Sequence, residues 1–174
     1  MDCRAAIAAP LAVAVAIAVP APAGAQMVEA KNNFHAAVNG MASLCPALVE
    51  GGTVPDESAS APFGLRPITS PAGEHRFQSL FNDGMLQVWF EPARRVCTVH
   101  YGGAGYRAIA GVARDFATSN GFQPFKIKDP KAPPGDVFIR PLPDGKGRQQ
   151  FIIVEDKKSQ TASVAFFLKS GPPR

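Results

Sequence analysis

The sequence has few of the residues that most often carry chemistry, with three cysteines, three histidines and one tryptophan in 174 residues. Its histidines, His35, His75 and His100, follow none of the spacings H-x-x-x-H, H-E-x-x-H or C-x-x-C that mark metal sites. No G-x-S-x-G or S-x-x-K signature surrounds a serine, and no cysteine–histidine family signature surrounds Cys97. The sequence therefore predicts no metal, no cofactor and no catalytic residue.

Long apolar runs and basic clusters are also missing from most of the chain. After residue 25, no stretch approaches the roughly 20 apolar residues that span a bilayer, and no cysteine follows that point directly to carry a lipid. Lys and Arg outnumber Asp and Glu by 18 to 14, for a net charge of +4. These basic residues are scattered, whereas nucleic-acid binding favours a basic stripe with interleaved aromatic residues. We therefore expect no membrane span after residue 25 and no nucleic-acid partner.

The first 25 residues are almost uncharged and end in the small-residue pattern A-G-A at 23–25. The apolar stretch AAIAAPLAVAVAIAVPAPAGA follows Arg4, an arrangement that is typical of a secretory signal peptide cleaved after Ala25. The alternative is a membrane anchor, which the three prolines in the stretch disfavour. We predict a signal peptide at 1–25, a periplasmic or secreted location, and a single domain at 26–174.

Cysteine usage predicts one disulfide bond. Cys3 lies in the predicted signal peptide, which leaves Cys45 and Cys97 in the exported chain. An oxidising compartment favours their pairing. The alternative is a free nucleophilic thiol, but neither cysteine has an adjacent histidine in the sequence and a thiol outside the cytoplasm is prone to oxidation.

Apolar residues at steps of three and four predict two main helices. The first covers 28–48 and carries Cys45 on its apolar side, and Pro46 should end or kink it. The second covers 106–120, with Gly121 as its stop. Both helices need an apolar surface to cover, which the strand-like remainder of the chain can supply.

The part between the first helix and the first clear strand is harder to interpret. Segment 51–73 contains four prolines and four glycines without an apolar period, which indicates a long loop that is either functional or mobile. The following stretch, EHRFQSLFNDG, favours a short helix, although Asp83-Gly84 also suits a hairpin turn.

Alternating apolar residues then predict a β-hairpin of strands 85–91 and 95–101, with Pro92 in the turn. Four later runs are also strand-like: FQPFKIK, DVFIRPL, QQFIIVE and ASVAFFL. Because the connections between successive runs are short, neighbouring strands should be antiparallel. The predicted fold is therefore α+β, with an antiparallel sheet of about five or six strands, the two main helices packed on one face, and a frayed tail at 170–174.

The stretch 103–108, GAGYRA, matches the dinucleotide-binding pattern G-x-G-x-x-A between a strand and a helix. Asp129 stands about where a ribose-binding acid belongs. However, that fold needs further parallel strands joined by helices, whereas the strand before this turn belongs to a hairpin and later connections are too short. We interpret the glycines as residues that permit a tight turn.

Strand alternation divides the hairpin into two faces. Cys97 marks the face that the helices should cover, so the opposite face carries Met85, Trp89, Thr98 and His100. Either segment 51–73 covers this second face, or the face is available to a protein partner or a second copy of the chain. The sequence leaves both alternatives open.

These observations favour an exported binding or interaction protein of the cell envelope, such as an inhibitor-like or accessory module, rather than an enzyme. The alternative is a small exported hydrolase whose site forms only in three dimensions. A cleft that gathers His100 or His35 with a carboxylate and a serine would favour the hydrolase. A flat sheet face with an aromatic centre would favour the binding protein.

Overall fold

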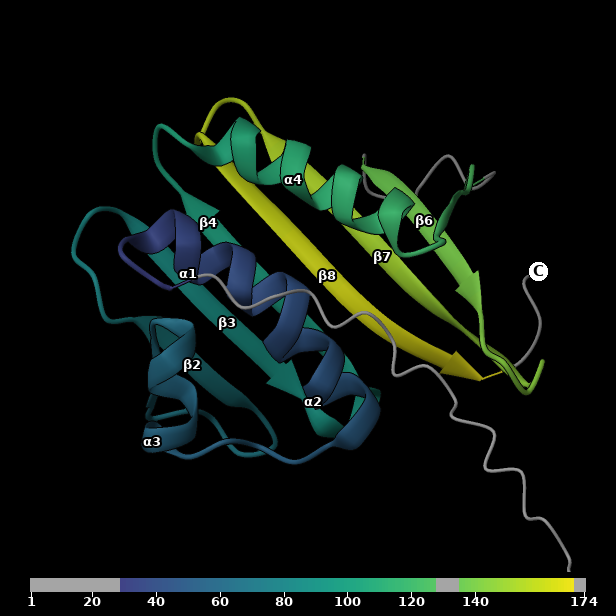
Figure 1. Ribbon diagram of the computed structural model, residues 1–174, viewed down its shortest axis with the longest axis horizontal. Coiled ribbons are helices and arrows are strands. Elements are labelled where there is room, and N and C mark those ends of the chain that lie inside the picture. The colour runs from purple at the N-terminus through teal and green to yellow at the C-terminus, as the bar shows by residue number, and fades with distance from the viewer. Residues whose placement is uncertain (1–28, 128–134, 171–174) are drawn as a thin grey trace, which may run out of the picture.

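The computed structural model describes residues 29–127 and 135–170 as one eight-stranded antiparallel sheet with helices on one face (Figure 1). The α+β class and the antiparallel sheet are as predicted, but the expected number of five or six strands was wrong. The predicted signal peptide at 1–25 and almost all of the predicted tail at 170–174 lie outside the described residues.

The helical elements fall into two main segments and several single turns. The first main segment runs without interruption through α1 (Asn33–Asn39), the π-helix η1 (Gly40–Leu44) and α2 (Cys45–Gly51). The second is α4 (Tyr106–Ser119), and the single turns are α3 (Glu57–Ser60), η2 (Ala61–Phe63) and η3 (Pro92–Arg94). Among the described residues, no helix is both long enough and apolar enough to cross a membrane.

The strands are β1 (Leu65–Ile68), β2 (His75–Ser79), β3 (Met85–Glu91), β4 (Val96–Gly102), β5 (Gln123–Pro124), β6 (Asp136–Pro141), β7 (Gly147–Asp156) and β8 (Thr161–Ser170). Their order across the sheet is β1-β2-β3-β4-β8-β7-β6-β5. Each half of the chain thus supplies one main helical segment followed by four strands in sequence order, and the halves meet where β4 pairs with β8.

Two predicted elements between the first helix and the hairpin differ from the structure. Segment 51–73 is not one irregular loop, because it contains α3, η2 and β1. The short helix expected around 77–81 is wrong, because residues 75–79 form β2. Phe77 is buried between the partly exposed Arg76 and Gln78, so the apolar residues there repeat every two positions.

Later in the chain, the run FQPFKIK, which was predicted to be a strand, contributes only the two residues of β5 in its described part.

The first helical segment continues through Pro46, contrary to the expectation of a break. Asn32 begins it as the N-cap, since its side chain accepts a hydrogen bond from the His35 backbone N–H at 2.9 Å. A proline inside an α-helix lacks the N–H and clashes with the preceding turn. Here the wider π-helical turn directly before Cys45 and Pro46 relieves that conflict. The segment ends at Gly52, which has φ +71°.

The core lies between the helices and one face of the sheet. Leu86, Val88 and Phe90 of β3 are buried there with Cys97 and Val99 of β4. The predicted disulfide between Cys45 and Cys97 is present, with both residues buried and their Cα atoms 5.3 Å apart. It joins α2 directly to β4, so it fixes the first helical segment on the centre of the sheet.

The second helix, α4, packs on the same face of the sheet through buried apolar residues and through ion pairs at its rim. Ile109, Ala110 and Ala113 of α4 are buried. On its rim, the Arg114 guanidinium donates to Asp136 of β6 at 2.7 Å and to Glu155 of β7. The hydrogen bonds that Arg114 donates to Glu155 and to Asp136 raise its pKa, which keeps it charged.

The G-x-G-x-x-A stretch forms the turn between β4 and α4. Gly103 has φ +119°, a conformation that favours glycine. A Cβ atom at Gly105 would lie 2.8 Å from the Tyr101 hydroxyl. The next strand, β5, pairs antiparallel with β6 on the far side of the sheet rather than parallel to β4. The strands of the described residues pair only antiparallel, unlike the parallel unit that binds dinucleotides, and Asp129 lies outside the described residues.

Candidate binding face of the sheet

The face of the sheet opposite the two main helical segments is the candidate site, and we call it the open face (Figure 1). Its residues follow from the register of the eight strands. Across its middle they are Ile68, Arg76, Trp89, Thr98, Ala165 and Ile152. The next row holds Arg66, Gln78, Gln87, His100, Ser163 and Val154. Most of these side chains are partly exposed, whereas their neighbours along the inner strands β3 and β4 are buried on the helix side.

Trp89 occupies the centre of the β1–β4 half of the open face. The Arg76 guanidinium carbon lies 4.9 Å from the centre of the indole ring, and the centroid of the His100 ring lies 4.2 Å from that of the indole. The indole N–H donates to Gln87 Oε1 at 3.1 Å. The indole N–H is therefore satisfied, and the ring contacts Arg76 and His100 while part of its surface stays exposed.

The residues around Trp89 come from three neighbouring strands rather than from segment 51–73. Its ring and hydrogen-bond contacts are to β2, β3 and β4. Met85 is 49% exposed at one end of β3, and Thr98 is the register partner of Trp89. The four residues singled out from the sequence, Met85, Trp89, Thr98 and His100, therefore share the open face.

His100 and Ser163 form the polar side of this centre. They are register partners on β4 and β8, and His100 Nδ1 lies 2.8 Å from Ser163 Oγ. Burial lowers the pKa of His100, because desolvation disfavours the charged ring. The imidazole is therefore neutral at pH 7 and presents an uncharged ring beside Trp89.

A serine next to a histidine is also part of the hydrolase alternative, so its surroundings matter. The hydrogen-bond and ion-pair partners of His100 in the described residues include no carboxylate that would orient the ring as in a catalytic triad. Both β4 and β8 are inner strands, so their backbone N–H groups point to neighbouring strands and offer no oxyanion hole. His35, the other candidate, lies near the start of α1. The geometry supplies a polar contact rather than a nucleophile.

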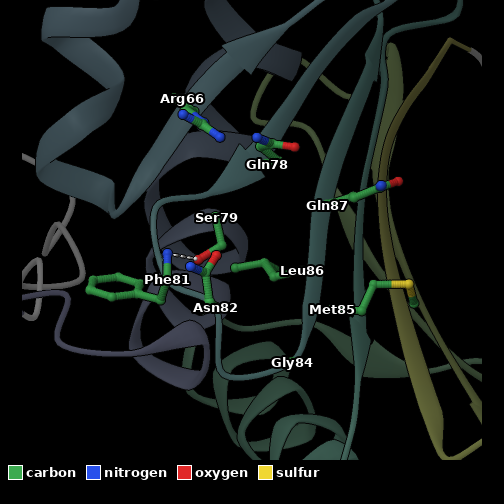
Figure 2. A pocket seen from close by; sticks show the side chains of 9 residues that line it. All are labelled: Arg66, Gln78, Ser79, Phe81, Asn82, Gly84, Met85, Leu86 and Gln87. Carbon is green, nitrogen blue, oxygen red and sulfur yellow. Dashed lines mark hydrogen bonds between the residues drawn. The ribbon is translucent and has the colours of Figure 1, made fainter.

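A pocket of about 300 Å³ opens beside the connection between β2 and β3 (Figure 2). Arg66, Gln78 and Gln87 of the open face contribute to its lining, with Ser79 at the end of β2 and Asn82 of the connection. With the Gln78 amide oxygen turned toward Arg66, that oxygen accepts from Arg66 Nε at 2.8 Å and Nη2 at 2.5 Å. Gln87 links this pocket to the indole N–H of Trp89.

Two other hollows lie on the helix side. A cavity of about 550 Å³ is lined by Glu50, Arg95, Arg140 and Gln149 among others, but these side chains already bond one another or backbone carbonyls. A groove of about 290 Å³ runs between the first helical segment and α4. Within residues 29–127 and 135–170, no three His, Cys, Asp or Glu side chains gather to hold a metal ion.

Sequence reasoning missed Arg66, Arg76 and Ser163 as members of the site. Arg66 and Arg76 were missed because β1 and β2 were interpreted as loop and helix. Ser163 was missed because nothing in the sequence indicates that β8 pairs with the distant strand β4 as well as with its chain neighbour β7. The alternation H-R-F-Q-S at 75–79 was the one usable signal, since it puts Arg76 and Gln78 on one side and Phe77 on the other.

Comparison of the chain with protein-family models, curated proteins and solved structures gave no match.

Proposed function

We propose that this chain is an exported binding protein that docks on a protein partner through the open face, with Trp89 at the centre of the contact. The observation that carries the proposal is a partly exposed tryptophan in contact with Arg76 and His100 on a sheet face that the main helices leave free. Tryptophan is the residue type most enriched among interface positions whose truncation costs about 2 kcal/mol or more.

The composition of the open face supports the same proposal. Around Trp89, the uncharged Thr98, Ala165 and Ile152 continue the row across the sheet. The charged Arg76 adjoins Trp89, while Glu91 at the end of β3 and Lys169 near the end of β8 lie toward the borders. An aromatic residue and an arginine at the centre, with a polar border, are usual in protein interfaces. Export is part of the proposal, supported by the disulfide and by the apolar first 25 residues.

The test replaces Trp89 by alanine and compares capture of partners from an extract of the source organism by wild-type and variant proteins. A partner retained by the wild type should bind the variant about 30-fold more weakly or worse. Ile127→Ala is the matched control, because Ile127 is also an exposed apolar residue, 40% accessible, but lies outside the open face. Sedimentation of the purified protein before and after substitution tests whether the partner is a second copy.

Stability measurements separate this proposal from a purely structural role. If Trp89 serves binding, the Trp89→Ala variant should remain folded, with a loss in unfolding free energy below the roughly 3 kcal/mol typical of a core aromatic residue. A larger loss with unchanged partner capture would contradict the proposal and make Trp89 an ordinary packing residue.

The hydrolase alternative retains one observation in its favour, the contact between His100 Nδ1 and Ser163 Oγ. Ser163→Ala tests it against a panel of chromogenic acyl esters. We expect no turnover by either protein, because the pair lacks an orienting carboxylate and an oxyanion hole. Ester hydrolysis by the wild type that Ser163→Ala abolishes would favour the hydrolase instead.

A further inference from the structure

The pocket beside Arg66 indicates the chemistry of the partner. We infer that the partner presents an acidic segment, with a carboxylate that enters this pocket and a nearby apolar side chain that packs on the ring of Trp89. This inference rests on the proposed function, since it assigns the partner of the same face.

The first support is the donor set in the pocket. Arg66 is exposed and directs Nε and Nη2 toward Gln78, which leaves the N–H groups of Nη1 for a ligand. Figure 2 shows Arg66 and Gln78 side by side at one end of the pocket, with Ser79 at the end of β2 and Asn82 of the connection below them. An arginine beside neutral donors is suited to a carboxylate, because guanidinium–carboxylate hydrogen bonds are short and charge-assisted.

Within the described part of the chain, no acidic side chain lines this pocket. The residues that line the pocket are polar or apolar except for the cationic Arg66. Arg76, the nearest basic residue on β2, is different, because its guanidinium is already bonded to Glu74 at 2.8 Å. In the described residues, the only side-chain partner of the Arg66 guanidinium is the neutral amide of Gln78, so its charge is not balanced by a carboxylate.

The second support is the spacing between the two contact points. Arg66, Gln78 and Gln87 are register partners across three adjacent strands, and Trp89 lies two residues further along β3. Strand spacing and rise place the Cα atoms of Arg66 and Trp89 about 12 Å apart. An extended peptide covers that distance in about four residues. One segment can therefore reach both points.

The third support is the charge of the open face as a whole, which disfavours a second copy as the occupant. Its basic residues exceed its acidic ones: Arg66, Arg76, Arg148 and Lys169 against Glu91 and Asp156. Two such faces brought together would repel each other, whereas a partner of opposite sign gains both attraction and a faster approach.

The experiment uses three short peptides, acetylated and amidated, that differ only at the first residue: Glu-Gly-Ser-Gly-Phe, Gln-Gly-Ser-Gly-Phe and Lys-Gly-Ser-Gly-Phe. Trp89 is the only tryptophan in the chain, so its fluorescence reports contact at the open face. We expect the glutamate peptide to bind about tenfold more tightly than the glutamine peptide, and the lysine peptide most weakly. Added salt should reduce the first difference.

Two variants locate the effect. Arg66→Gln should remove the preference for glutamate, whereas Arg107→Gln, which removes the same charge from an exposed position on α4, should leave it unchanged. Equal binding of all three peptides, or a glutamate preference that survives in Arg66→Gln, would overturn the acidic partner while leaving the open face as a binding surface. No fluorescence change with any peptide would also overturn this inference, and the Trp89→Ala capture experiment would then decide the proposed function separately.

Discussion

Cys45 on α2 and Cys97 on β4 are joined by a disulfide across 52 residues of sequence, and both are buried. The bond links the first helical segment to one of the two central strands of the sheet. It therefore reduces the conformational freedom of the unfolded chain between Cys45 and Cys97, and in the native structure it joins the helical layer to the sheet.

Removal of this disulfide should destabilise the protein by about 4 kcal/mol, according to the loop-closure entropy of a chain of this length. Chemical denaturation of the Cys45→Ala/Cys97→Ala double variant would measure the loss. The matched control is the wild type under reducing conditions, which should give a similar midpoint. An unchanged midpoint in both would contradict the expectation.

Gly103→Ala should lower the free energy of unfolding by about 1 kcal/mol or more, because φ at this position is +119°. Gly105→Ala should also destabilise, for a different reason, since its Cβ atom would crowd the hydroxyl of the buried Tyr101. Gly111→Ala is the control: a Cβ there meets no atom within 4 Å, and alanine favours the helix. Thermal melting of the three variants should place only Gly111→Ala at or above the wild type.

His100 should make the stability depend on pH. Its folded-state pKa is lowered by burial, so the unfolded state binds a proton more readily. The stabilisation that comes from keeping His100 neutral is complete above its unfolded-state pKa of about 6.5. It is lost as the pH falls from there toward the folded-state pKa of His100. Urea denaturation across this range should show the loss in the wild type and in His75→Gln, an exposed control, but not in His100→Gln. An identical profile for His100→Gln and the wild type would refute the assignment.

Arg114→Met should cost about 1 kcal/mol of unfolding free energy, because one side chain holds both Asp136 and Glu155 against α4 at a partly exposed position. Raised ionic strength should weaken the wild type and leave Arg114→Met less affected. The control is Arg107→Met on the exposed surface of the same helix. Equal salt dependence of the two variants would show that the ion pairs contribute nothing measurable.

The parts of the fold that the sequence predicts well are those set by local pattern. The hairpin of β3 and β4, helix α4 and the disulfide follow from alternation, a 3.6-residue period and two cysteines on apolar faces. Strand β1 could not be predicted, because Pro67 and flanking glycines resemble a loop and only pairing with β2 makes it a strand. The helix through Pro46 depends on a π-helical turn that has no clear sequence signal.

Some residues of the candidate site can also be predicted from local pattern, whereas others depend on tertiary pairing. Trp89 and His100 lie in one hairpin, so alternation alone places them on one face. Arg66, Arg76 and Ser163 join them through pairings that depend on the whole sheet, above all the contact between β4 and β8, strands that are more than 50 residues apart in sequence. Such long-range register is determined by tertiary packing rather than by local propensity.

The symmetric strand order also has a consequence for assembly. The two halves of the chain are joined through a single ladder, β4 with β8, apart from the packing of the helices above it. If that ladder opens, each half exposes one long unpaired edge that is complementary to the edge of the other half. Two molecules opened in this way can exchange halves, with the turn at Gly103 as the hinge, and form a domain-swapped dimer that preserves every native pairing. The disulfide lies within the first half, so it does not prevent the exchange.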